Sequence, residues 1–169
     1  MSIEISGSIE KQEVRKILEK YNPYIPNDYI DFLSKSNGIF INGNSYCVIP
    51  FSKVDDKEVS FQELYGIKTN NVEFDFENIN NIRLDITRFN NPIIIAGDPG
   101  GNFFLFSGNQ NDNKIYYWDS THIHLNNNSD YPEKNEEGNI YIFSNNFNEF
   151  YELIIKNLGG DTSIIRKDL

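Results

Sequence analysis

The chain has 169 residues, 38% hydrophobic and 24% charged, which is an ordinary globular composition and enough chain for one domain with a sizeable core. Its formal net charge of −10 argues against direct binding to nucleic acid or to an anionic membrane, and favours a basic partner. The 13 phenylalanines, 10 tyrosines and single tryptophan suit a substantial sheet, because aromatic residues are enriched in strands.

Two helices are expected near the N-terminus. Ser8 can cap the first helix, whose apolar residues recur at helical spacing until Pro23 ends it. Pro26 suits the first residue of a second helix, which Asn37-Gly38 would close with a left-handed cap.

A β-hairpin is expected next, with strands at Ile39–Ile41 and Tyr46–Ile49 joined by an Asn-Gly-Asn turn. The charged stretch 51–84 allows no firm assignment beyond short helical possibilities around 60–65 and 80–86. This stretch is therefore the least determined part of the sequence.

Short strands separated by polar loops are expected in the second half, at residues 92–96, 102–107, 114–119 and 139–143. Asn146 can cap a last helix with Glu149 as capping-box partner, and Gly159-Gly160 ends it. Because the loops are too short for crossover helices, the pairing should be antiparallel. We expect an α+β fold: a single domain over 1–169, with its core at about 8–158, in which N-terminal and C-terminal helices pack on an antiparallel or mixed sheet.

The segment Gly97-Asp98-Pro99-Gly100-Gly101-Asn102 follows one predicted strand and opens another. A phosphate-binding loop would need a Gly-Lys-Ser/Thr sequence opening a helix, and no lysine follows here. Proline and glycine instead favour a tight turn.

Catalytic motifs are missing from the sequence. His122 and His124 near Asp119 could form part of a metal site, and a metal-dependent hydrolase using Asp98, Asp119 and His122 is one alternative. No third ligand motif accompanies them, and no Gly-x-Ser-x-Gly motif occurs. We therefore expect no catalytic residues, no metal, no cofactor and no enzymatic activity.

The sequence also carries expectations about location. Residues 1–10 have neither the basic start nor the apolar stretch of a secretory signal, and no apolar run is long enough to cross a bilayer. We expect a cytoplasmic protein that does not bind membranes. Cys47 lies in an apolar run and is expected to be a buried free thiol.

Four ordered motifs resemble the SUKH superfamily, the Smi/Knr-like proteins. They are Ile-Pro-Asn-Asp-Tyr-Ile-Asp-Phe-Leu at 25–33 with Asn-Gly at 37–38, the strand and turn at 93–102, Lys-Ile-Tyr-Tyr-Trp-Asp at 114–119, and Phe-Ser followed by two phenylalanines at 143–150. The run that follows Asp119 departs from the charged continuation often present in the family.

This resemblance implies a non-catalytic fold and, for bacterial members, an immunity protein that binds and neutralises a cognate toxin. The implied toxin belongs to a polymorphic or contact-dependent system and is often a basic nuclease, which suits the acidic chain. A regulatory or scaffold binding module is the alternative. We expect a monomer or weak dimer.

The expected partner-binding residues are the acidic residues of 55–77, which could collect on one face, together with residues of the turn and of the aromatic strand. They are Asp55, Asp56, Glu58, Glu63, Glu73, Asp75, Glu77, Asp98, Asn102, Tyr116, Trp118 and Asp119.

Overall fold

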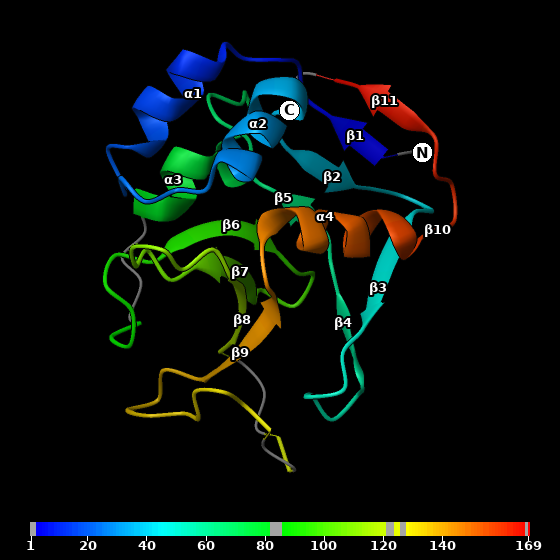
Figure 1. The fold of residues 1–169 in the computed structure, drawn as a ribbon. Coiled ribbons are helices and arrows are strands. Elements are labelled where there is room, and N and C mark those ends of the chain that lie inside the picture. Colours follow the sequence, from blue (N-terminus) through cyan, green and yellow to red (C-terminus); the bar gives the residue numbers. More distant parts are fainter. Residues whose placement is uncertain (1–2, 82–85, 121–123, 126–127, 168) are drawn as a thin grey trace.

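Two sheets and four helices organise the chain in a computed structural model that describes residues 3–81, 86–120, 124–125, 128–167 and 169 (Figure 1). The helices are α1 (Lys11–Leu18), α2 (Asn27–Ser36), α3 (Phe76–Asn81) and α4 (Phe147–Lys156), with a short 3-10 helix, η1 (Val72–Phe74). The strands are β1 (Ile3–Ile5), β2 (Ile39–Ile41), β3 (Tyr46–Pro50), β4 (Glu58–Ser60), β5 (Glu63–Leu64), β6 (Ile93–Gly97), β7 (Phe103–Phe106), β8 (Ile115–Asp119), β9 (Asn139–Ser144), β10 (Leu158–Gly159) and β11 (Ile164–Arg166).

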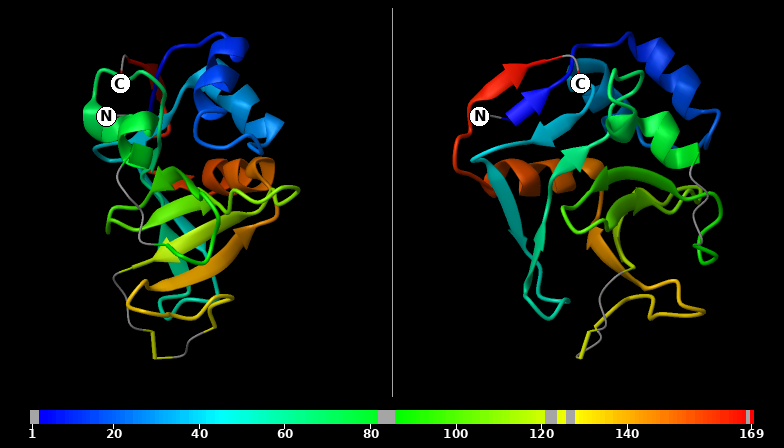
Figure 2. Two further views of the ribbon diagram at one scale, coloured as in Figure 1. Left: turned by 90° about the vertical axis from the view of Figure 1, so that its left-hand side faces the viewer. Right: turned by 180° about the vertical axis from the view of Figure 1, so that it is seen from behind.

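The larger sheet has eight strands in the order β11-β1-β2-β5-β6-β7-β8-β9, and the smaller has the order β10-β3-β4. β1 pairs with β11 in parallel, whereas the other pairs are antiparallel. The two ends of the chain therefore lie side by side at one edge of the large sheet (Figure 2). The predicted α+β fold with a mixed sheet and packed helices is confirmed.

The expected hairpin of β2 with β3 is wrong. Both segments are strands, but β2 pairs with β1 and β5, whereas β3 pairs with β4 and β10. A turn hydrogen bond from Ser45 N to Asn42 O remains between them. Each strand buries its alternate side chains in the main core, and the connecting turn passes from one sheet to the other.

The helical possibility around 60–65 is also wrong, because this stretch contains the end of β4 and β5. Val59 and Phe61 are buried while Ser60 is exposed, which is the period-two alternation of a strand. The possible helix at 80–86 corresponds in part to α3, which ends at Asn81, and residues 82–85 lie outside the described part of the chain.

The helix ends agree only partly with the sequence. α1 starts after Glu10 without a side-chain cap and ends at Leu18, so the expected Ser8 cap and the extension toward Pro23 are wrong. Pro26 precedes α2, and Asn37 adopts the predicted left-handed conformation with φ of 39°. The Asn146 side chain caps α4 by accepting the Glu149 N–H at 2.9 Å, as predicted.

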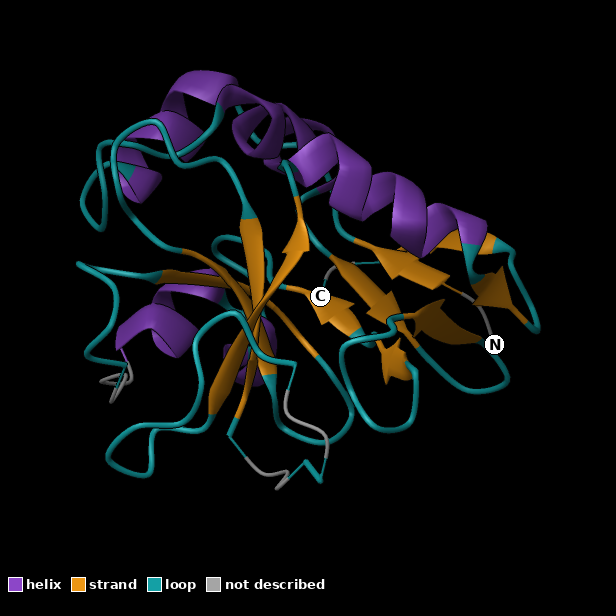
Figure 3. Ribbon diagram, turned by 60° about the horizontal axis from the view of Figure 1, so that its bottom comes forward, coloured by secondary structure: helices purple, strands orange, loops and turns teal. Residues whose placement is uncertain are grey.

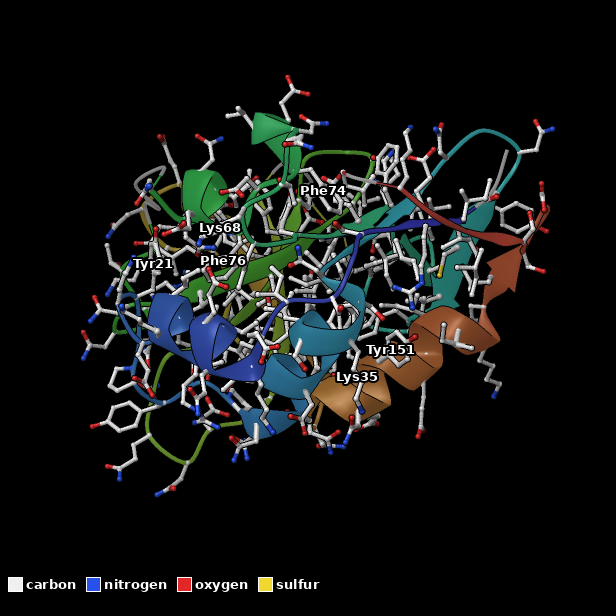
Figure 4. The ribbon with its side chains drawn as sticks, turned by 90° about the horizontal axis from the view of Figure 1, so that it is seen from above. Tyr21, Lys35, Lys68, Phe74, Phe76 and Tyr151 are labelled. Atoms are coloured by element: carbon white, nitrogen blue, oxygen red, sulfur yellow. The ribbon has the colours of Figure 1, made fainter. Side chains whose placement is uncertain are left out.

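Aromatic rings fill the space between the large sheet and the helices. Phe104 of β7 contacts Phe150 of α4, with ring centroids 5.0 Å apart, and Tyr29 of α2 contacts Phe147 at the same distance. At the other end of the helical layer, Tyr21 packs edge-on against Phe76 at 5.4 Å (Figure 4). These contacts join both ends of the chain to one core.

The opposite face of the sheet carries a smaller apolar cluster. Phe89 packs against Tyr116 at 4.7 Å and Tyr131 at 5.4 Å, beside the buried Leu105 and Ile140. This cover makes β7 and β8 buried on both faces. None of the described helices is long and apolar enough to span a bilayer.

Candidate functional site

A cleft lies between the β3–β4 hairpin and the end of the large sheet where β6 turns into β7. The strands that bound it are among those drawn in orange in Figure 3. The cleft has a volume of about 510 Å³. It is lined by Val54, Asp56, Glu58, Val59, Ser60, Asp98, Pro99, Gly100, Asn102, Tyr117, Asp119 and His124. No lysine or arginine occurs among these described lining residues, which include four acidic side chains and one histidine.

Asp98 organises the β6–β7 turn. Its Oδ1 accepts the backbone N–H groups of Gly100 and Asn102, both at 2.8 Å. Its Oδ2 accepts the Asn102 side-chain amide at 3.1 Å and the Tyr117 hydroxyl at 2.8 Å. Gly101 has φ of +86°, a conformation that favours glycine. The predicted tight turn is confirmed, because β7 and not a helix follows it.

Tyr117 and Asp119 face the cleft together because alternate residues of β8 share one face. Burial and the charge of Asp98 raise the pKa of Tyr117 above its ordinary value, so the hydroxyl stays protonated and donates to the Asp98 carboxylate. The Asn102 side-chain oxygen accepts the Ser120 N–H at 3.1 Å. These bonds hold the turn against the end of β8.

Asp119, His124 and Asp55 form a connected group, here termed the histidine cluster. His124 Nε2 lies 2.8 Å from Asp119 Oδ2, and both side chains are almost fully buried. His124 Nδ1 lies 3.6 Å from Asp55 Oδ2, which also accepts the Leu125 N–H at 2.8 Å. The cluster therefore ties the β3–β4 hairpin to the segment after β8.

Tyr141 lies beside this cluster on β9, with its ring 5.8 Å from the His124 ring. Its hydroxyl is buried and makes no hydrogen bond within the described structure. Burial, followed by the charges of Asp119 and Asp55, raises the pKa of Tyr141 to about 12.

Asp56 and Glu58 form the outer rim of the cleft. Both are exposed and both line the cavity. Neither side chain makes a hydrogen bond or an ion pair with any residue that the structure describes, in contrast to the side chains of Asp98 and Asp119. The rim carboxylates are therefore available to a partner.

The structure brings together only part of the predicted partner-binding set. Asp56, Glu58, Asp98, Asn102 and Asp119 line one cleft, with Asp55 attached through His124. Residues far apart in sequence meet there because the β3–β4 hairpin and the β6–β7 turn line the same cleft.

The other acidic residues of 55–77 do not share this face. Glu63 and Glu73 line a separate cavity of about 490 Å³, and burial raises the pKa of Glu63. Asp75 accepts the N–H groups of Glu77 and Asn78 at the start of α3 and is therefore a helix cap. The acidic side chains of residues 55–77 therefore do not collect on one face.

The two aromatic members of the set lie on the other face of the sheet. Tyr116 belongs to the smaller apolar cluster and donates to Asp112 at 2.9 Å. Trp118 stacks on Phe103, and its indole N–H donates to the Glu137 carbonyl at 2.5 Å. Both positions follow from the alternation of β8, in which 116 and 118 point away from 117 and 119.

Sequence reasoning missed Tyr117 as a member of the site. The signal was present, since Tyr117 stands two residues before Asp119 in a predicted strand. The sequence around β8 does not show which face of this strand contacts the β6–β7 turn.

The metal alternative rested on Asp98, Asp119 and His122. Within the described ranges, no group of three or more His, Cys, Asp or Glu side chains could hold a metal ion. His122 itself lies outside the described residues. His124 instead contacts Asp55 of the hairpin and Asp119 of β8, and so connects these two segments.

Comparison with known families gives one match. A family model for the SMI1 / KNR4 family (SUKH-1) matches residues 8–153, which is most of the chain. No curated protein and no solved structure matches the chain. The matched range contains every residue that lines the cleft.

Proposed function

Because the chain belongs to the SMI1 / KNR4 family (SUKH-1), we propose that it is an immunity protein that binds a cognate bacterial toxin and neutralises it by protein–protein contact. The proposed toxin is basic and of the nuclease type made by polymorphic or contact-dependent systems. The proposed site of action is the cytoplasm.

The acidic cleft is the observation that carries this proposal. Its two walls bear Asp56 and Glu58 on the hairpin and Asp98 and Asp119 on the sheet side, with no lysine or arginine in the described lining. A chain with a net charge of −10 attracts a basic partner over a distance, and a cleft lined by one sign of charge focuses that attraction. Toxins that act on nucleic acid need basic surfaces, so charge complementarity supports this pairing.

The hydrogen bonds of Asp98 and the raised pKa of Cys47 support a binding role over a catalytic one. All four bonds at Asp98 hold the turn or Tyr117, which makes this carboxylate a structural acceptor. Burial raises the pKa of the Cys47 thiol to about 12, which makes it a poor nucleophile. We propose a protein without enzymatic activity.

One edge of the large sheet is closed, which supports the proposed monomer or weak dimer. Asp130 Oδ2 accepts the Ile142 N–H at 2.7 Å, and Tyr131 forms a bridge with Ile140. These contacts occupy edge groups of β9 that another strand would need.

Co-expression with the candidate toxin encoded by an adjacent gene tests the proposal. The expected result is restored growth of the toxin-expressing host and a stable complex on gel filtration. A catalytically inactive toxin variant should still form the complex, which separates binding from survival. Unrestored growth with no complex, or capture of several cellular partners and no toxin, would favour the scaffold alternative.

A further inference from the structure

The carboxylates around the cleft fall into two groups with different partners. Asp98 and Asp119 are bonded within the chain, to the turn and Tyr117 in one case and to His124 in the other. The side chains of Asp56 and Glu58 are exposed and have no hydrogen-bond or ion-pair partner among the described residues. Resting on the proposed function, we infer that the cleft is a receptor for an arginine side chain of the toxin, with Asp56 and Glu58 as its contacts.

The hairpin presents the two rim carboxylates on a fixed support. Val54 and Val59 on either side of them are buried in the core. Backbone bonds from Phe51 N to Lys57 O, 2.8 Å, and from Lys57 N to Val54 O, 3.1 Å, close the turn. A receptor whose groups are already in place loses little conformational entropy on binding.

Asp55 adds a second attachment of the hairpin. Through Leu125 N and His124 it joins the turn to the segment after β8, on the far side of the cleft. The position of the hairpin is therefore fixed by its own turn bonds and by the contacts of Asp55 with Leu125 and His124. Carboxylates on a fixed support favour a ligand that binds in one orientation over one that is held only by long-range attraction.

The chemistry of the cleft selects a cation with several donors. A guanidinium has five N–H groups in a planar fork and pairs with carboxylates bidentately, whereas an ammonium is a compact point charge. A guanidinium can engage both rim carboxylates, Asp56 and Glu58, through different N–H groups.

Titration with argininamide, followed by backbone amide NMR shifts, tests the inference without the toxin. Citrullinamide is the matched probe, because it has nearly the same shape and lacks the charge. We expect saturable shifts concentrated at residues 54–60 and 98–102 with argininamide, and none with citrullinamide.

Charge-matched variants separate a local contact from overall attraction. The double variant Asp56→Lys/Glu58→Lys and the control Glu19→Lys/Glu152→Lys each replace two acids with two lysines, so each has a net charge of −6 in place of −10. Glu19 and Glu152 are exposed and line no part of the cleft. The rim variant should bind argininamide at least about tenfold more weakly than the control.

Equal weakening in the two variants, or shifts spread over the acidic surface, would overturn the inference. Circular dichroism of both variants shows whether they remain folded, and Asp56→Asn/Glu58→Gln provides a milder change if they do not. A toxin that is neutralised equally well by the rim variant would overturn the arginine contact and leave the immunity role intact. A wild-type protein that binds argininamide in the cleft but neutralises no toxin would contradict the immunity role alone.

Discussion

The Tyr117 hydroxyl donates a 2.8 Å hydrogen bond to Oδ2 of Asp98 and thereby connects the middle of β8 to the β6–β7 turn. Asp98 also accepts two backbone N–H groups of its own turn and the Asn102 amide. The family-signature turn is thus shaped by a carboxylate whose acceptor sites are engaged inside the chain.

Replacing Asp98 with alanine should lower the free energy of unfolding by about 2–3 kcal/mol, since part-buried donors lose a charged acceptor. Urea denaturation followed by circular dichroism measures this change. Tyr117→Phe removes one of the same bonds and should cost about 1 kcal/mol. An unchanged midpoint combined with lost toxin binding would instead place Asp98 in the interface.

Asn37 is expected to be critical for stability although it lies outside the cleft. Its buried side chain donates to the Ile67 carbonyl at 2.9 Å and accepts the Ile67 N–H at 2.8 Å. Asn37→Ala leaves both groups unpaired and adds left-handed strain, so a loss of about 3 kcal/mol is expected from thermal or urea unfolding. Asn37→Gly also removes both hydrogen bonds, but glycine adopts the left-handed conformation without strain. Its loss in free energy of unfolding should therefore be about 1 kcal/mol smaller than that of Asn37→Ala. Equal losses in both variants would contradict the role of the backbone conformation.

Buried tyrosines should make the fold sensitive to alkali. The pKa values of Tyr29, Tyr65, Tyr116 and Tyr117 are raised, mainly by burial, and that of Tyr141 is raised to about 12. The unfolded chain releases these protons near the ordinary pKa of 10.0, whereas the folded chain retains them. Their contribution to stability is therefore complete below pH 10 and is lost as the pH rises toward 12.

Tyrosinate absorbance and circular dichroism, recorded together during an alkaline titration, test this dependence. The buried tyrosines should ionise in the same step as the loss of folded structure. Ionisation of every tyrosine in a folded protein would contradict it.

Tyr141→Phe should leave stability unchanged within about 0.5 kcal/mol or raise it, because the buried hydroxyl of Tyr141 has no partner in the described structure. Tyr29→Phe on α2 is the matched variant, since its hydroxyl is also buried and unpaired. Differential scanning calorimetry of both variants measures the effect. A loss of several degrees in Tm for Tyr141→Phe alone would reveal a bond to that hydroxyl in the native protein.

Local patterns in the sequence determined much of the secondary structure. The Asn146 cap, the left-handed Asn37 and the strands around 93–97, 103–106 and 115–119 all depend on neighbouring residues. A cap bonds residues three positions apart, and a strand shows its alternation within five residues, so these signals lie within short windows.

Strand pairing and the composition of the cleft were decided by the tertiary structure. The sequence by itself determined the α+β class, the tight turn at Asp98 and the resemblance that points to an immunity role. It could not show that Ile39–Ile41 and Tyr46–Pro50 enter different sheets, because that choice depends on which distant surfaces each strand buries. For the same reason only the fold could place Glu58 opposite Asp98 and turn Trp118 away from both.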